Sequence, residues 1–146
     1  MLEKVLVPTD GSERAMRAVK YAKDLLKQGL IKKVTILHVK PAVEEHWEHY
    51  GLGNLDFEFK YRCVINDDAK RILRISEDVF ESEGLPVETV FLCGDISETI
   101  VNYAEENQFN LIIMGNQGLT RLGELLLGSV CDRVIRQVSI PVMIIK

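Results

Sequence analysis

The chain has 146 residues, of which 47% are hydrophobic and 27% charged, and its formal net charge is −4. This length and apolar content predict one domain, residues 1–146, with a substantial buried core. The chain is acidic overall and has no cluster of basic residues, so its charge does not support nucleic acid as a partner. No apolar run approaches the ~18 residues of a membrane span, and the N-terminus shows no signal peptide, so we expect a cytoplasmic protein without a membrane partner.

The N-terminal part predicts a strand followed by a helix. Residues 4–7 form an apolar run of strand length, and the polar turn after it contains Ser12, a residue type that caps helices. Helical spacing of apolar residues follows, and Gly29 predicts the end of the helix. The face that we expect to be buried consists of Ala15, Ala18, Val19, Ala22, Leu25 and Leu26.

Strand-like and helical segments alternate along the rest of the chain. Further strands are expected at residues 34–39, 87–92, 111–114 and 142–145. A second helix is marked by Ile65, Ala69, Ile72, Leu73, Val79 and Phe80, before Gly84 and Pro86. A third is marked by Ile96, Ile100, Tyr103 and Ala104, with Asp95 and Glu98 as a capping pair, and a fourth by Leu127, Val130, Cys131, Val134, Ile135 and Val138. This alternation predicts an α/β fold, a parallel sheet with helices on both faces.

Residues 41–62 break the alternation. They are rich in Glu, His, Trp and Tyr without a clear period, and we predict a connector that passes over the mouth of the sheet. His46 and His49 lie three apart beside Glu45 and Glu48, a spacing that could bind a metal on a helix. A solvated connector is the favoured interpretation, and no metal site is expected.

The cysteines Cys63, Cys93 and Cys131 are odd in number and widely spaced. Without a C-x-x-C arrangement they predict neither a disulfide framework nor a zinc site, and they indicate a reducing compartment. Cys131 stands among apolar residues at helical spacing. We therefore predict a small buried core residue there instead of a reactive thiol.

Spaced glycines follow the fourth predicted strand. Gly115 and Gly118 come directly after it, and Gly128 precedes Ser129 and the last helical pattern. Glycine lets backbone N–H groups approach a phosphate, because it has no Cβ and can adopt positive φ, and Ser129 is expected to open a helix whose N-terminus faces the anion. Ordinary turn and cap glycines are the alternative.

Residues 123–129 have the spacing of a Walker A loop, but Ser129 stands at the position of its lysine. This difference excludes a P-loop NTPase.

Asp10 lies in the polar turn after the first predicted strand. Ligands of open parallel sheets bind beyond the carboxyl ends of the strands, where the strand order reverses, and in the order 3-2-1-4-5 this point lies between strands one and four. Asp10 and Gly115 are therefore expected to flank one crevice. A carboxylate repels phosphate, so Asp10 is better suited to ribose hydroxyls or adenine; a turn residue supporting Ser12 is the alternative. Thr9 and Val39 would supply a polar contact and an apolar wall for the base.

These motifs together resemble the universal stress protein family over the whole chain. The matching pieces are Val-Pro-Thr-Asp-Gly-Ser at 7–12, Leu37-His38-Val39, Gly-Asp-Ile-Ser-Glu at 94–98, Gly-x-x-Gly-x9-Gly-Ser at 115–129, and Pro141-Val142. The resemblance implies a flavodoxin-like or adenine nucleotide α-hydrolase-like fold, a five-stranded sheet of order 3-2-1-4-5, and a homodimer joined through the last strand. That strand, residues 142–145, is apolar and has no following helix to cover it, which also predicts antiparallel pairing with a second copy.

The resemblance also implies ATP as the ligand, because the chain keeps every glycine of the element that distinguishes ATP-binding members. The residues that match the family's contacts to adenine and ribose are Pro8, Thr9, Asp10 and Val39; those that match the wall around ribose and phosphates are Met114, Gly115, Gly118, Gly128, Ser129 and Val130. Mg²⁺ is expected to be held mainly by the phosphates. Many members have Ser and His or Arg between the first two glycines, where this chain has the neutral Asn116 and Gln117. Arg121 is a candidate phosphate contact, with a solvated arginine as the alternative.

Three functions are compatible with this pattern. The first is an ATP-binding sensor or regulator in stress response, because the phosphate cradle comes with little catalytic machinery. The second is a slow ATPase or nucleotidyl-transfer enzyme of the α-hydrolase-like superfamily. The third, a phosphoacceptor receiver, lacks the expected acidic cluster and later lysine. We expect a regulator without catalytic residues.

Overall fold

Five parallel strands form the central sheet of the computed structural model, which describes residues 2–44, 61–116 and 128–146. Their order in the sheet is β5-β2-β1-β6-β7. The strands are β1 (Leu2–Pro8), β2 (Ile31–Lys40), β5 (Glu88–Cys93), β6 (Leu111–Gly115) and β7 (Val142–Ile145). Counted within this sheet alone, the order is 3-2-1-4-5 as predicted, and it reverses between β1 and β6.

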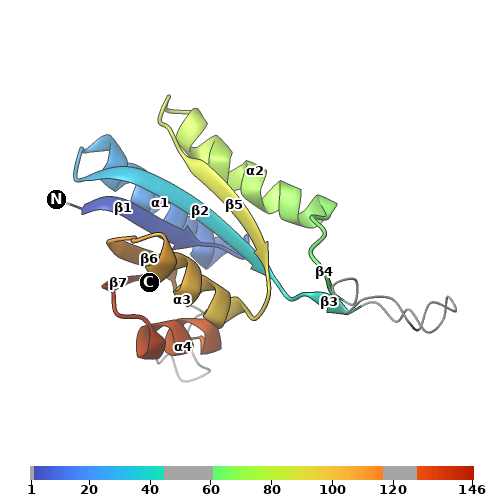
Figure 1. Ribbon diagram of the computed structural model, residues 1–146. Coiled ribbons are helices and arrows are strands. Elements are labelled where there is room, and N and C mark those ends of the chain that lie inside the picture. Colours follow the sequence, from blue (N-terminus) through green and yellow to red (C-terminus); the bar gives the residue numbers. More distant parts are fainter. Residues whose placement is uncertain (1, 45–60, 117–127) are drawn as a thin grey trace, which may run out of the picture.

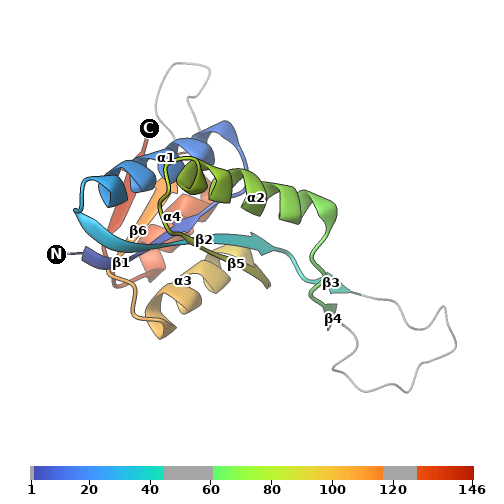
Figure 2. The ribbon, with the colours of Figure 1, turned by 90° about the horizontal axis from the view of Figure 1, so that it is seen from above.

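Helices cover both faces of the sheet (Figures 1 and 2). One face carries α1 (Glu13–Lys27) and α2 (Asp67–Glu81), and the other carries α3 (Ile96–Glu106) and α4 (Ser129–Gln137). None of the helices within the described ranges has the length and apolar character needed to cross a membrane.

The helix ends follow local chemistry that the sequence predicted. The Ser12 hydroxyl accepts a hydrogen bond from the Ala15 N–H at 3.2 Å, and the Asp95 carboxylate accepts one from the Glu98 N–H at 3.0 Å. Both bonds satisfy N–H groups that have no partner within the helix. Gly29 has a φ of +75° just after α1, a conformation that glycine adopts without steric cost.

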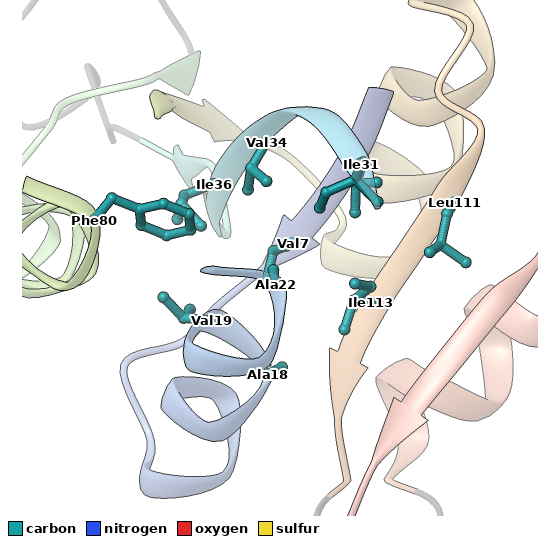
Figure 3. Close-up of a cluster of buried hydrophobic side chains, with 11 residues drawn as sticks. Val7, Ala18, Val19, Ala22, Ile31, Val34, Ile36, Phe80, Leu111 and Ile113 are labelled. Carbon is teal, nitrogen blue, oxygen red and sulfur yellow. The ribbon is translucent and has the colours of Figure 1, made fainter. Parts of the chain in front are cut away.

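The core consists of two apolar clusters, one on each face of the sheet. Successive strand residues point to opposite faces, so Val7 packs towards α1 and α2 while Leu6 packs towards α3 and α4. Figure 3 shows the first cluster, in which Phe80 of α2 lies near residues of α1 and β2. Because both faces are covered, the strands read as continuous apolar runs.

Two residues assigned to buried helical faces are exposed, which corrects those predictions. Ile65 is 39% exposed and lies before α2, because Asn66 caps the helix by accepting from the Ala69 N–H at 2.8 Å. Ile135 is 40% exposed on α4, beside the buried Val134. Apolar periodicity shows the centre of a buried stripe but not where its edge meets solvent. Leu127, also assigned to this helix, lies outside the described residues.

The connector after β2 starts and ends in a small antiparallel ladder. β3 (Val43–Glu44) pairs with β4 (Tyr61–Arg62), and both project beyond the end of β2 (Figures 1 and 2). Residues 45–60 of the predicted excursion, with His46 and His49, lie outside the described residues. In the part of the chain that the structure describes, no group of three or more His, Cys, Asp or Glu residues is placed to hold a metal ion.

Cys63 and Cys93 form a disulfide, so the prediction that the cysteines form no disulfide framework is wrong for this pair. Their Cα atoms lie 5.4 Å apart at a sequence separation of 30. Cys93 pairs with Lys40 in the β2–β5 ladder, and the β3–β4 ladder returns the chain to the same end of β2. The contact therefore depends on strand pairing and leaves no sign in the cysteine spacing. The expectation of a reducing compartment loses the support that it took from unpaired cysteines.

Candidate functional site

A cavity of about 590 Å³ opens at the carboxyl ends of β1, β2 and β6. Pro8, Thr9 and Asp10 line it from the end of β1, Val39 from β2 and Gly115 from the end of β6. The strand order reverses at this point, where ligands of open α/β sheets bind. Its volume is within the range of small-molecule sites, about 300–1,000 Å³. The predicted crevice is present where we expected it.

Most of the residues predicted to contact a ligand lie in this cavity. They are Pro8, Thr9, Asp10, Val39, Met114, Gly115 and Val130. Ser129 opens α4, as predicted, and lines a smaller cavity of about 230 Å³ that shares Ile96 and Val130 with the first. Gly128 is buried and is the N-cap residue of α4. Gly118, Gln117 and Arg121 lie outside the described residues.

The turn after β1 is held by its own side chains. The Ser12 N–H donates to Asp10 Oδ1 at 2.9 Å, and the Gly11 N–H donates to Thr9 Oγ1 at 3.1 Å. Asp10 therefore has the turn role that we considered as the alternative to ligand contact. A carboxylate can accept several hydrogen bonds, so the turn leaves acceptor capacity on the exposed Asp10 for a ligand.

His38 fixes the same turn from within the sheet. Its Nδ1 lies 2.8 Å from the Thr9 carbonyl oxygen, and the Thr9 N–H donates to the Leu37 carbonyl at 2.8 Å. A carbonyl only accepts, so His38 Nδ1 must carry the proton. Both sides of Thr9 are thus held, which positions Asp10. We predicted no role for His38, although a histidine within an apolar strand signals a bonded side chain.

Gly115 allows the end of β6 to lie directly against the start of α1. A Cβ at this residue would come within 2.8 Å of the Ala15 backbone nitrogen and closer still to the Arg14 carbonyl group. The expected positive φ is absent at both described glycines of the motif: Gly128 has a φ of −65°, and Gly115 is not among the positive-φ residues. The need for glycine at 115 is therefore steric, and the conformational reason that we gave is wrong.

The first two turns of α1 add charged residues that the sequence did not indicate. Glu13, Arg14 and Arg17 line the cavity, and Arg17 pairs with Glu13 at 3.0 Å. Among the described residues, no carboxylate pairs with the half-buried Arg14. The position of these charged residues in the cavity wall depends on how α1 crosses β6, and helical periodicity does not show this crossing. The apolar part of the wall includes Leu37, Ile96 and Ile100.

Cys131 and Asn116 lie in the cavity wall near β6 and α4. The Cys131 thiol donates to the Gly115 carbonyl at 3.2 Å. Burial, and secondarily the negative charge of Asp10, raises the pKa of this thiol, which favours its neutral form. Cys131 is 3% exposed, so the prediction of a small buried core residue is confirmed. Asn116 follows β6 and is also buried, and its backbone N–H donates to the Ile145 carbonyl at 2.9 Å.

Comparison with known proteins decides the family. The model of the universal stress protein family matches residues 1–146. The chain belongs to the universal stress protein family. Universal stress protein MJ0577 of Methanocaldococcus jannaschii is 33% identical over 156 residues, covering 100% of this chain and 96% of that protein. Universal stress protein MJ0531 of the same organism is 30% identical over 152 residues, covering 100% of this chain and 83% of that protein.

Solved structures related to this universal stress protein share its fold. The structure of MJ0577 aligns with a TM-score of 0.71, 33% identity and coverage of 100% of this chain and 96% of that one. A universal stress protein described in complex with cAMP aligns with a TM-score of 0.70, 25% identity and coverage of 99% and 97%. The predicted family and the predicted α/β fold are both confirmed.

Proposed function

We propose that this universal stress protein binds ATP in the cavity between β1 and β6 and acts as a nucleotide-dependent sensor or regulator in stress response. The observation that carries the proposal is the meeting of Asp10 and Gly115, far apart in sequence, at one cavity where the strand order reverses. A related protein of the same fold is described in complex with cAMP, which supports an adenine nucleotide as the ligand.

The walls of the cavity fit the parts of this ligand. Apolar side chains, Val39 among them, suit the base, and the Asp10 carboxylate suits ribose hydroxyls. We place the phosphates towards Gly115 and the N-terminus of α4, where unpaired N–H groups and the helix dipole favour an anion. Arg14 adds positive charge to the cavity wall. The full set of proposed contacts is Pro8, Thr9, Asp10, Val39, Met114, Gly115, Gly118, Gly128, Ser129 and Val130, with Mg²⁺ held mainly by the phosphates.

Two further properties belong to this proposal. We infer a homodimer that pairs through β7, because this strand is the edge of the sheet and an edge strand presents unpaired N–H and C=O groups. We also place the protein in the cytoplasm. The Cys63–Cys93 disulfide is compatible with that compartment if it forms transiently, as cytosolic disulfides usually do.

Isothermal titration calorimetry with ATP and Mg²⁺ tests the binding. We expect the wild-type protein to bind, and Asp10→Ala to bind about tenfold more weakly because it loses an acceptor for the ribose. Asp10→Asn is the matched control, since its Oδ1 can still accept from the Ser12 N–H and preserve the turn. A contact to ribose predicts a partial loss in Asp10→Asn. A role in the turn alone predicts wild-type affinity, and no binding at millimolar ATP contradicts the proposal.

Analysis of ADP and AMP in the same samples separates a regulator from the alternative, a slow ATPase or nucleotidyl-transfer enzyme. We expect slow or no product formation. The described residues that line the cavity include no lysine or histidine, and Glu13 is paired with Arg17. Steady product release that Asp10→Ala and Asp10→Asn reduce in parallel with binding would favour the enzyme.

A further inference from the structure

Asn116 has a buried carboxamide that no described residue hydrogen-bonds. The residue is 0% exposed, and neither its Oδ1 nor its Nδ2 has a partner among the described residues. Buried polar side chains are nearly always hydrogen-bonded in folded proteins, and leaving one unbonded destabilises the fold. The described residues of the chain therefore leave the Asn116 carboxamide in need of a partner.

The position of Asn116 indicates where this partner comes from. Asn116 lines the proposed ATP cavity and follows Gly115 directly. Strand residues alternate between faces, so the side chain continues the face of Met114, the one covered by α3 and α4. Val130 and Cys131 also line this cavity. Neither polar atom of this carboxamide is accessible to water in the ligand-free protein, so a ligand in the cavity reaches them only when the Asn116 side chain turns towards it.

We propose that the missing partner is a ribose hydroxyl of the bound nucleotide, and this inference rests on the proposed function. The carboxamide presents an N–H donor beside a carbonyl acceptor. A phosphate oxygen only accepts, so it would leave Asn116 Oδ1 unbonded. A hydroxyl both donates and accepts, and the vicinal hydroxyls of ribose satisfy both atoms. Asp10 from β1 and Asn116 from β6 then contact the sugar from two sides of the cavity.

This role predicts opposite effects on stability and on binding. Asn116→Leu is close in size and removes both unbonded polar atoms, so the ligand-free variant is expected to have a Tm a few degrees higher than the wild-type protein. The same change removes the contact to the sugar, so its affinity for ATP is expected to fall about tenfold. A residue that only supports the fold would not stabilise the protein when it is removed and weaken binding at the same time.

The test combines thermal unfolding with calorimetry of ATP, 2′-deoxy-ATP and 3′-deoxy-ATP. The wild-type protein is expected to bind ATP more tightly than the two deoxy analogues. In Asn116→Leu the ratio of the affinity for ATP to that for at least one analogue is expected to fall about tenfold. Ser76→Ala is the control, because Ser76 is buried in α2 and its hydroxyl is already bonded to the Ile72 carbonyl at 2.9 Å. We expect Ser76→Ala to keep the wild-type preference. Asn116→Ser introduces a single hydroxyl that can donate or accept, and this variant is expected to keep part of the wild-type preference.

The outcomes separate this inference from the proposed function. If the wild-type protein binds none of the three nucleotides, both are wrong. If it binds ATP and Asn116→Leu keeps the wild-type preference for ribose, only the role of Asn116 is wrong. A lower Tm in both Asn116→Leu and Asn116→Ser also overturns that role, because the ligand-free carboxamide would then be stabilising the fold.

Discussion

At Gly115 the end of β6 meets the first turn of α1 so closely that a side chain has no space. A Cβ there would lie within 2.8 Å of the Ala15 nitrogen. We expect Gly115→Ala to lower the free energy of unfolding by about 3 kcal/mol, measured by urea denaturation of the ligand-free protein. Because folding itself is affected, a loss of ATP binding in this variant does not by itself demonstrate a phosphate contact.

Gly29→Ala is the matched control for this substitution. A Cβ at Gly29 would meet no atom within 4 Å, so the change tests only the strain of its φ of +75°. That strain costs about 1 kcal/mol. A free-energy loss in Gly115→Ala no larger than in Gly29→Ala would contradict the steric role of Gly115.

Single residues differ in how far the sequence reveals their roles. Asp10 and Gly115 could be assigned to the site because Asp10 lies in the turn after an apolar strand pattern and Gly115 directly follows another. The roles of His38, Arg14 and Asn116 could not be predicted. Each depends on a neighbour supplied by another element: the Thr9 carbonyl for His38, the crossing of α1 for Arg14 and the cavity wall for Asn116.

At the scale of elements, the Cys63–Cys93 disulfide ties the segment before α2 to the end of β5. It closes a loop with a sequence separation of 30, which restricts the unfolded chain. Reduction is expected to lower the free energy of unfolding by about 2–4 kcal/mol, measured by guanidinium denaturation with and without reductant. The Cys63→Ser, Cys93→Ser double variant is the control and should not respond to the reductant. An unchanged midpoint in the reduced wild-type protein would refute a stabilising disulfide.

The starts of α1 and α3 were predicted well because a cap is a contact between residues three positions apart, as at Ser12 and Asp95. The β3–β4 ladder was not predicted. Its strands have two residues each, too few to show the alternation that marks a longer strand. Their pairing also depends on a partner on the far side of residues 45–60.

On the scale of the whole molecule, β7 sets the expected assembly. The Pro141 carbonyl accepts a hydrogen bond from Ile112 of β6, and the Ile145 carbonyl accepts one from Asn116, which follows β6. The N–H groups of Val142 and Ile144, which alternate with these residues, therefore point to the outer edge. We expect light scattering at micromolar concentration to give twice the chain mass of 16.6 kDa. Val142→Pro removes one outward N–H and should shift the protein towards the monomer.

Val142→Thr is the matched control, since it keeps the N–H and the branched shape of valine. It should remain dimeric if the strand edge makes the contact. A monomeric mass for the wild-type protein, or equal masses for the proline and threonine variants, would contradict pairing through β7.

The sequence by itself determined the order of strands and helices, the caps of α1 and α3, and the placement of Asp10 and Gly115 after strands. These features depend on local periodicity and turn chemistry, which a linear pattern contains. The tertiary structure alone decided the disulfide, the fit of Gly115 against α1, the bond from His38 to Thr9, and the unbonded carboxamide of Asn116. Each of these depends on atoms that only the pairing of strands and the packing of helices bring together from distant parts of the chain.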